Sequence, residues 1–509
     1  MNSEIILHSP TFILAVPLLF AFLTPLFDRV SKKLRDGVFF AGLFLTAFFV
    51  SLMAYRVYTV GDWAYVFGSG SIEPGEGTVP FFRIQFLADG VSAMATITLA
   101  ISSIGAGIYA YAFVAEETGL NKFYTLFLLT VAGVNGMVLT GDLFNLFVWF
   151  EVTSISTCAL IAFRNYKGQA VEAAIKYMII SVVSGLFLLF SVALLYGQYG
   201  VLNFELLSQN ISGTYIDKIA LAILVVVMAL KSGAVPLHFV TPDAYSMAPG
   251  SITAVLVVAS QAGLWVLFRI VFNLYGLAVD TLTVGWIVII LGVLSMFIGV
   301  TMALVQKTVK RLMAYHAVSQ TGYMLLGVGV GLAVLGQPEM EAYGRTAMEG
   351  GIFHIINHAM YKGLLFLTAG VIIFKTGKRK LDELGGLGHS MKWTMVFFMI
   401  GALAIAGIPP FNGFSSKLMI YKSVYQFNPI LSIIAMVVSI LTLASFVKVF
   451  HSIFMGPKDE EIAETGEAPK GMLVGMAVLA GTVIIFSLFP GLIVSTIVEP
   501  AVESLGVIL

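Results

Sequence analysis

Apolar runs of about 20 residues, the length that crosses a bilayer as a helix, recur along nearly the whole chain. Their recurrence predicts an all-α polytopic membrane protein with about fourteen transmembrane helices. The predicted spans fall near residues 11–27, 37–58, 87–111, 121–140, 142–163, 171–199, 216–241, 249–275, 282–305, 311–335, 347–374, 391–425, 429–455 and 471–498.

Two polar stretches interrupt this pattern and predict extramembrane segments. Residues 59–86 contain Gly, Pro, Glu73 and Glu76 and are expected to form a small hairpin. Residues 456–470 carry an acidic cluster, interpreted as a solvated face: Asp459, Glu460, Glu461, Glu464 and Glu467. The N-terminus lacks a basic region followed by a small-residue cleavage site, so the first apolar run is expected to be a retained span.

Basic residues are distributed unequally between the two sides of the predicted spans. Odd-numbered loops carry seventeen Lys and Arg residues, whereas even-numbered loops carry only Arg83 and Arg345. The positive-inside rule therefore places the odd loops in the cytoplasm and both termini on the outer face of the cell membrane. A missed span would scramble this asymmetry, so it supports the count of fourteen. The seventeen are Arg29, Lys32, Lys33, Arg35, Lys122, Arg164, Lys167, Lys307, Lys310, Arg311, Lys375, Lys378, Arg379, Lys380, Lys392, Lys458 and Lys470.

The composition agrees with a membrane protein. Hydrophobic residues make up 59% of the 509 residues and charged residues only 11%, against about 25% charged residues in an average soluble domain. The mean hydropathy is +0.96. The net charge is zero, so nothing indicates a nucleic-acid partner. The single cysteine, Cys158, excludes an internal disulfide and a multi-cysteine metal cluster, and it is interpreted as a small buried apolar residue.

One carboxylate lies in the middle of a predicted span. Glu151 follows Asp142 by nine residues, which is about 13.5 Å along a helix and close to the midplane of a hydrocarbon layer roughly 30 Å thick. An unpaired carboxylate there is costly and normally faces a partner or a wet cavity. We therefore expect a basic group elsewhere in the chain to reach Glu151.

Nine basic residues lie within or at the ends of the predicted spans. Five lie near enough to span ends for their side chains to extend to the membrane surface: Arg56, Lys176, Lys218, Arg269 and Lys422. Four lysines are predicted to lie deeper: Lys231, Lys362, Lys417 and Lys448. Several buried lysines together with a buried glutamate indicate a functional site, because intramembrane charge is expensive.

Two of these lysines lie beside predicted helix breaks. Lys231 precedes Pro236 and Pro242, with His238 between them as a possible path residue. Lys417 follows Gly407, Pro409, Pro410 and Gly413. Spans 4–8 and 9–13 form two groups of five, and each lysine lies in the fourth helix of its group. This correspondence is typical of inverted-repeat transporters with sites near the midplane. For Lys231, a purely neutralising role toward Glu151 is the alternative.

A line of titratable side chains occurs between the two breaks. His354, His358 and Lys362 follow at i, i+4 and i+8 and share one helix face. Histidine can accept and release a proton near neutral pH, so the line predicts a proton relay. A metal site and ordinary core histidines are the alternatives, although the segment lacks the Glu of a His-Glu-x-x-His motif. His316, a turn or so inside the tenth span, is a candidate extension of the relay.

No cofactor is expected in this chain. Gly327, Gly329 and Gly331 lie in an apolar helix, which favours helix packing over a nucleotide site. The sequence contains no Walker motif, CxxC pair, haem signature or nucleophile elbow. If a redox reaction is involved, its cofactors belong to other chains.

Four motifs resemble the antiporter-like proton-translocating family: TGDLFNLFVWFE, KSGAVPLHFVTPDAYSMAP, KRLMAYHAVSQTGY and HIINHAMYKGLLFLTAG. This family includes the large antiporter-like subunits of respiratory complex I, two of the large subunits of Mrp-type antiporters, and subunits of membrane-bound hydrogenases and sulfane reductases. The resemblance covers nearly the whole chain. It implies fourteen helices with inverted repeats, a Glu151–Lys231 pair, a central hydrophilic axis and a terminal Lys417.

The resemblance divides the chain into residues 1–111 with three spans, a first repeat at 121–275, a second repeat at 282–455 and a C-terminal span at 471–509. One position departs from the family pattern. The family usually has a lysine in the eighth span before a glycine, whereas this chain has Gln261. Glutamine can orient water but cannot carry the charge. We therefore expect water near Gln261 and His316 to join Lys231 to Lys362, with His316 as the protonatable station.

Together these features predict a proton-translocating membrane subunit of a larger complex. The favoured partners are other membrane subunits and a redox module with iron–sulfur clusters, as in a hydrogenase or sulfane reductase. The alternative is the D-type component of an Mrp sodium/proton antiporter without redox chemistry. A stand-alone solute transporter and a structural membrane anchor are rivals from other classes, although an anchor has no use for buried lysines.

Overall fold

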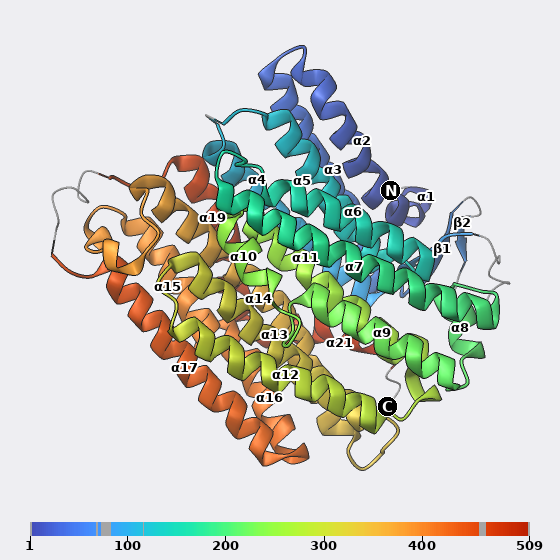
Figure 1. Ribbon diagram of the computed structural model, residues 1–509. Helices are drawn as coiled ribbons and strands as arrows, with labels where there is room; N and C mark the ends of the chain where they lie inside the picture. The colour runs from blue at the N-terminus through green and yellow to red at the C-terminus, as the bar shows by residue number, and fades with distance from the viewer. Residues whose placement is uncertain (1–2, 68–69, 73–82, 116, 458–464, 507–509) are drawn as a thin grey trace.

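The computed structural model describes residues 3–67, 70–72, 83–115, 117–457 and 465–506. Its long helices run roughly parallel to one another, with a small sheet at one end of the bundle (Figure 1). The helices are α1 (Ser3–Leu7), α2 (Ser9–Asp28), α3 (Lys32–Thr59), α4 (Gly90–Phe113), α5 (Leu120–Leu139), α6 (Leu143–Ile161), α7 (Gly168–Tyr199), α8 (Phe204–Asn210), α9 (Tyr215–Ser232), α10 (Val240–Met247), α11 (Gly250–Arg269), α12 (Thr281–Leu304), α13 (Val309–Ala333), α14 (Glu341–Thr376), α15 (Lys392–Ala406), α16 (Asn412–Phe427), α17 (Pro429–Phe454), α19 (Lys470–Leu488), α20 (Pro490–Ile493) and α21 (Glu499–Glu503). Short 3-10 or π segments are η1 (Ile270–Tyr275), η2 (Gly276–Ala278), η3 (Leu381–Glu383), η4 (Leu387–His389) and η5 (Val494–Val498).

The segment between α3 and α4 forms a three-stranded antiparallel sheet. Strands β1 (Trp63–Val66) and β2 (Gly70–Ile72) make the predicted hairpin, and β3 (Gln85–Ala88) pairs with the other edge of β1. Glu73 and Glu76 lie outside the described residues, as do Lys458 and all of the acidic cluster except Glu467. The sheet follows α3 directly and leads into α4, so it covers one end of the N-terminal helices.

Eleven helices in the described part of the chain are long and apolar enough to cross a membrane. The chain is therefore a polytopic, predominantly helical membrane protein. The other predicted spans correspond to α13 and to two interrupted pairs, α9–α10 and α15–α16. Helix α13 has 25 residues but many polar positions, and each interrupted pair is divided into segments of at most 18 residues, so counting long apolar helices does not give the predicted count.

Both predicted helix breaks are present. Helix α9 ends at Gly233, whose φ of 74° is left-handed, and α10 begins seven positions later. Helix α15 ends at Gly407, with φ of 76°, and α16 begins at Asn412. Glycine adopts this conformation without the steric penalty that a Cβ brings. Each break leaves a buried lysine close by, Lys231 before the first and Lys417 after the second.

Helices α11, α13 and α14 form the centre of the molecule. Nearly every residue of α11 and α13 is buried, and the middle of α14 is fully enclosed by α11, α13 and α16. Polar side chains at these positions face protein and not lipid. The predicted relay residues of α14 therefore lie inside the protein.

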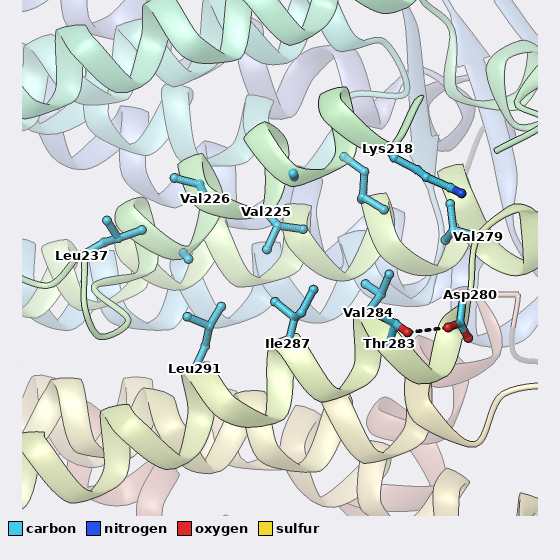
Figure 2. Close-up of a pocket in the computed structure, with 13 residues that line it drawn as sticks. Lys218, Val225, Val226, Leu237, Val279, Asp280, Thr283, Val284, Ile287 and Leu291 are labelled. Atoms are coloured by element: carbon cyan, nitrogen blue, oxygen red, sulfur yellow. Dashed lines mark hydrogen bonds between the residues drawn. The ribbon is translucent and has the colours of Figure 1, made fainter. Parts of the chain in front are cut away.

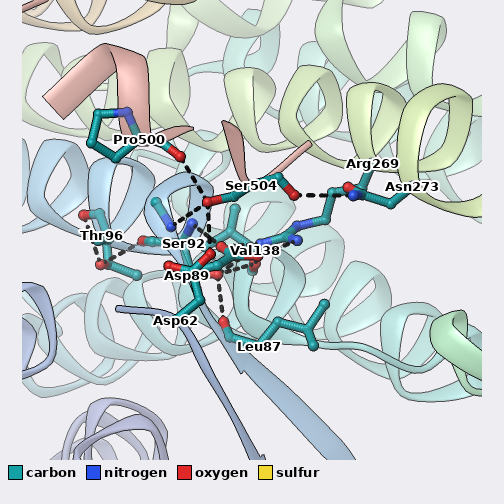
Figure 3. A network of polar contacts seen from close by, with 12 residues as sticks. Asp62, Leu87, Asp89, Ser92, Thr96, Val138, Arg269, Asn273, Pro500 and Ser504 are labelled. Atoms are coloured by element: carbon teal, nitrogen blue, oxygen red, sulfur yellow. Dashed lines mark hydrogen bonds and ion pairs between the residues drawn. The ribbon is translucent and has the colours of Figure 1, made fainter. Parts of the chain in front are cut away.

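One basic residue assigned to a span end is instead buried. Arg269, at the end of α11, is 1% exposed and does not extend to the membrane surface. Its guanidinium donates two hydrogen bonds of 2.7 Å to the Asp89 carboxylate and one of 2.8 Å to Ser92 Oγ (Figure 3). The backbone N–H of Gly90 donates to Ser504 from the C-terminal segment. The nearness of Arg269 to the end of its span suggested an exposed side chain and could not reveal Asp89 as its partner. Among the other four, Lys176, Lys218 and Lys422 are exposed as expected.

Candidate functional site

Glu151 lies half-buried on α6 against a glycine of α7. An added Cβ at Gly185 would come within 1.9 Å of the Glu151 carboxylate, so the absence of a side chain at Gly185 makes room for it. Lys231 attracts this carboxylate electrostatically. Both residues are described, and no direct ion pair joins them. The structure therefore holds the predicted pair in a separated arrangement.

The Lys231 ammonium is held by neutral groups of α6. Its Nζ donates a 2.9 Å hydrogen bond to Ser154 Oγ and lies 4.4 Å from the centre of the Phe150 ring. Its stem packs on Gly263 of α11, where an added Cβ would approach within 3.1 Å. A cavity of about 20 Å³ beside Lys231 is large enough for about one water molecule. The amine can therefore be hydrated without leaving the protein.

Gln261 of α11 makes one of the polar contacts between the two halves of the chain. Its Nε2 lies 2.6 Å from His358 Nδ1 and 3.0 Å from the carbonyl oxygen of Ile355, both on α14. Gln261 Oε1 and His358 Nε2 have no protein hydrogen-bond partner among the described residues. Buried polar atoms of this kind are normally satisfied by water. Gln261 and His358 thus join α11 directly to the line of titratable groups on α14.

His316 makes no direct hydrogen bond to Gln261 among the described residues. It is fully buried on α13, and its Nε2 lies 2.7 Å from Ser445 Oγ on α17, with the ring packed on Phe446. Lys362 and Lys417 both act on it electrostatically. His358 contacts Gln261 directly, and the role of His316 as the protonatable station near Gln261 stays a prediction.

The predicted line on α14 is buried and leads toward α16. His354 Nδ1 lies 2.9 Å from Ser416 Oγ, and its Nε2 lies 3.1 Å from Gln320 Oε1 on α13. The Tyr361 hydroxyl lies 3.3 Å from the same His354 Nε2. Ser416 immediately precedes Lys417. The histidine face predicted from spacing therefore leads toward the second broken helix through a serine that spacing did not indicate.

Lys362 lies inside the protein without a hydrogen-bond partner among the described residues. Its side chain is 0% exposed, and its Nζ lies 5.5 Å from the centre of the Phe366 ring and 5.8 Å from that of Phe446. Aromatic faces attract an ammonium but do not accept its protons as a carbonyl does. Of the four lysines predicted to lie deep, only Lys362 has no hydrogen-bond acceptor among the described residues.

Lys417 is held by the second helix break. Its Nζ donates to the carbonyl oxygen of Ile405 at 2.8 Å and to Ser439 Oγ at 3.1 Å, and it lies 4.8 Å from the Tyr323 ring centre. An added Cβ at Gly407 would meet Lys417 Cδ at 2.9 Å. The glycine therefore supplies both the left-handed turn and the space for the lysine stem.

Two other predicted residues lie at the margins of this arrangement. Lys448 is exposed and donates to the Leu304 carbonyl oxygen at 3.1 Å, so the prediction that it is deeply buried is wrong. It lies two turns before the end of α17, where a long side chain can reach the membrane surface. His238 is half-buried in the first break and stacks on Phe239. Neither contacts the line of residues from Lys231 to Lys417.

Sequence reasoning missed several groups of the site. Ser154, Gly185, Tyr361 and Ser416 are common residue types in spans, and only their tertiary contacts distinguish them. In the described residues, no group of three or more His, Cys, Asp or Glu side chains could hold a metal ion. His354 contacts Ser416 and Gln320, and His358 contacts Gln261. The two histidines of the His-x-x-x-His spacing therefore take part in hydrogen bonds to other protein groups.

A separate cavity of about 520 Å³ lies between α9 and α12 (Figure 2). Its walls are apolar, with Lys218 and Asp280 at one end and Leu237 and Leu291 at the other. None of the predicted translocation residues lines it. The buried titratable groups are therefore arranged along hydrogen bonds and ring contacts and not around this large cavity.

The proteins with similar sequences include subunits of sodium/proton antiporters and of respiratory enzymes. The family model described as "NADH:quinone oxidoreductase/Mrp antiporter, TM" matches residues 140–442. The chain is 33% identical to the D component of the Na⁺/H⁺ antiporter of Alkalihalophilus pseudofirmus, over 80% of each chain. It is 30% identical to the N component of the NADH-quinone oxidoreductase of Desulforudis audaxviator, over 97% of this chain and 98% of that one. It is also 30% identical to the larger A component of the same Alkalihalophilus antiporter but spans only 62% of that protein.

Two solved structures share the fold. A chain of the membrane-bound sulfane sulfur reductase, an archaeal respiratory membrane complex, superposes with a TM-score of 0.84 and 27% identity, covering 98% of this chain and 99% of that one. A chain of the Mrp complex from Dietzia superposes with a TM-score of 0.86 and 25% identity, covering 99% and 98%. The extent of the family match and these identities lead to one conclusion: the chain belongs to the NADH:quinone oxidoreductase/Mrp antiporter family of antiporter-like membrane subunits.

Proposed function

We propose that this chain carries protons across the cell membrane as one subunit of a multi-subunit complex. The observation that supports this most is the buried line of titratable and hydrogen-bonding groups between the two helix breaks. Its members are Glu151 and Lys231, then Gln261 in contact with His358, then His354 in contact with Ser416 beside Lys417. Ordered water is proposed to join these contacts. Protons move along such a line through side chains and ordered water, with no cofactor in this chain.

The proposal includes an electrostatic switch at Glu151. When its carboxylate approaches Lys231, the attraction favours the protonated amine. When the pair separates, as in the structure, the amine has Ser154 and an aromatic ring as neighbours but no direct counter-charge. A buried amine without a counter-charge releases its proton more readily. Approach and separation of the pair would thus load and unload Lys231.

The proposed function also implies an arrangement of spans that the helix bounds alone do not establish. We propose fourteen spans, with the pairs α9–α10 and α15–α16 each counted as one broken span, in two inverted repeats of five. Both termini then lie on the outer face, and the loops rich in Lys and Arg lie in the cytoplasm. The two breaks beside Lys231 and Lys417 support the correspondence of the repeats.

The proposal has two versions, which differ in the source of energy for proton movement. In the favoured one, a redox module with iron–sulfur clusters on partner chains drives proton movement, which the resemblance to the sulfane reductase chain supports. In the other, the chain works as the D-type component of a sodium/proton antiporter, which the identity to the Alkalihalophilus antiporter supports. Mild purification from native membrane and identification of the bound subunits distinguishes them. The apolar cavity between α9 and α12 gives no support to a stand-alone solute carrier.

Glu151→Gln tests the function itself. Glutamine is nearly isosteric and removes only the charge, so the complex should assemble normally. Coupled ion movement in proteoliposomes should fall by about tenfold or more, because Lys231 loses its alternating partner. Glu172→Gln, an exposed glutamate on neighbouring α7, is the matched control and should behave as wild type. Normal coupled transport by a fully assembled Glu151→Gln complex would refute Glu151 as a working group.

A further inference from the structure

We propose that Lys310 is a proton-carrying station that connects Lys362 to the molecular surface bearing the basic loops, and that the Phe366 ring separates the two amines. This inference rests on the proposed function and extends it. Lys310 entered the sequence prediction only as one of seventeen loop cations. The structure instead buries it at the start of α13, beside the centre of the second half of the chain.

The environment of Lys310 is unusual for a loop lysine. The residue is 6% exposed, and its Nζ donates to the carbonyl oxygen of Ala248 and, at 3.0 Å, to Thr253 Oγ. Both acceptors are neutral, and no carboxylate pairs with Lys310 among the described residues. An ammonium has three N–H donors, and burying its charge without a counter-charge is costly. Such an amine is suited to losing and regaining its proton.

Lys310 has access to the surface that carries the basic loops. It lines a cavity of about 420 Å³ together with Arg311, Arg379, Lys380 and Glu383. Lys380 is exposed, so the cavity extends to the protein surface. Arg311 is paired with Asp243, and Lys380 with Glu383. Lys310 is therefore the buried and unpaired amine at the inner wall of this cavity.

One aromatic ring is shared by Lys310 and Lys362. The Lys310 Nζ lies 6.0 Å and the Lys362 Nζ 5.5 Å from the centre of the Phe366 ring. Phe366 is four residues after Lys362 on α14, one turn further toward the cavity end of that helix. An apolar ring does not relay a proton, so transfer requires the ring to move and water to enter. Phe366 thus serves as a gate between the cavity and Lys362.

A structural role for Lys310 makes a different prediction. Ala248 is the C-cap residue of α10, and a cation there stabilises the free carbonyl of a helix end. Arginine would serve that purpose, because it keeps the charge and the donors. Arginine does not release its proton in proteins. Lys310→Arg therefore separates a proton carrier from a helix cap, and Lys310→Met removes both roles.

The first experiment measures coupled proton movement by the intact complex in proteoliposomes. Lys310→Arg and Lys310→Met should both lower the rate by about tenfold or more, whereas Lys380→Gln, at the rim of the same cavity, should retain it. A wild-type rate in Lys310→Arg would overturn the inference, whether or not Lys310→Met is impaired. Glu151→Gln is measured in parallel: if it abolishes transport while Lys310→Arg does not, only this inference fails. If Glu151→Gln is fully active, the proposed function fails.

The second experiment tests the gate without relying on activity. Cys158→Ala removes the only cysteine of this chain, and Lys362→Cys introduces a single reporter thiol. A charged thiol reagent is added to the complex, and labelling of this chain is read by mass spectrometry. Phe366→Ala should raise labelling several-fold. Phe446→Ala is the matched control, because Phe446 also contacts Lys362 but not Lys310, and it should leave labelling low. Equal labelling in the two variants would overturn the gate.

Discussion

At the scale of single residues, the buried amines are held by neutral partners. Lys231 donates to a serine, Lys417 to a carbonyl and a serine, and Lys362 lies between aromatic rings. A buried ion pair fixes a proton firmly, and breaking it by removal of one partner is strongly destabilising. Neutral hydrogen bonds are weaker and permit either protonation state. This choice of partners suits the proposed role, in which these side chains release a proton as readily as they accept one.

The junction between the halves gives a prediction at this scale. Gln261→Leu keeps the approximate size of the side chain but removes the contacts to His358 and the Ile355 carbonyl. We expect coupled transport to fall by about tenfold or more, because no polar group then joins α11 to α14 at this point. Transport is measured in proteoliposomes of the assembled complex.

The matched variant for this test is Ser445→Ala, which removes the hydrogen bond of His316. It should have the smaller effect if Gln261 and His358 form the junction. The opposite ranking, with Ser445→Ala more damaging than Gln261→Leu, would restore His316 as the station that the sequence predicted.

At the scale of helices, the two breaks bring backbone groups to the lysines. Gly407 ends α15 and leaves the Ile405 carbonyl free to accept from Lys417. An unbroken helix would use that carbonyl in its own ladder. Irregular backbone is tolerated at membrane depth only where other groups satisfy it. The break and the lysine therefore stabilise each other.

Gly407→Ala tests this coupling. Alanine at a φ of 76° is strained by about 1–2 kcal/mol, and its Cβ would also meet Lys417 Cδ at 2.9 Å. We expect both a lower melting temperature and a several-fold fall in transport. Gly200→Ala is the control, because Gly200 ends α7 with φ of 70° and has open space around it. It should lose similar stability but keep the specific transport rate; a similar loss of transport in both variants would show that strain alone is responsible.

At the scale of the whole molecule, a buried polar network joins distant parts of the chain. Arg269 from the end of α11 is paired with Asp89, which also caps the N-terminus of α4 through the Ser92 N–H. Ser504 from the C-terminal segment bonds to Gly90 and Asp62 nearby (Figure 3). The network thus ties the first half of the chain, the N-terminal helices and the C-terminus together, away from the lysine line.

Asp89→Asn should destabilise the protein without touching the proposed translocation groups. Asparagine retains the helix cap but leaves Arg269 buried without its counter-charge, at a cost of about 3 kcal/mol or more. The melting temperature of the purified complex should fall, while the transport rate per assembled complex should be unchanged. Glu172→Gln, in an exposed ion pair, should change the stability by less than about 1 kcal/mol. Equal melting temperatures for the two variants would contradict the structural role of the network.

The sequence alone determined the membrane character of this protein, its helix breaks and the identity of most buried titratable groups. These follow from local physics: lipid demands long apolar helices, glycine and proline interrupt them, and charge within a span is too costly to be incidental. The spacing of His354, His358 and Lys362 placed them on one helix face for the same local reason.

Only the tertiary structure decided which of these groups meet. A side chain's partner depends on the rotation and packing of neighbouring helices, which one sequence does not encode in its periodicity. His316 bonds to Ser445 of α17, Arg269 is buried against Asp89, and Lys448 is exposed, and position along the sequence revealed none of these contacts. Lys310 is the converse case, because a cation near a loop became buried when α10, α11 and α14 packed around it. Spacing along one helix is a local property, whereas contact between helices is a property of the packed molecule.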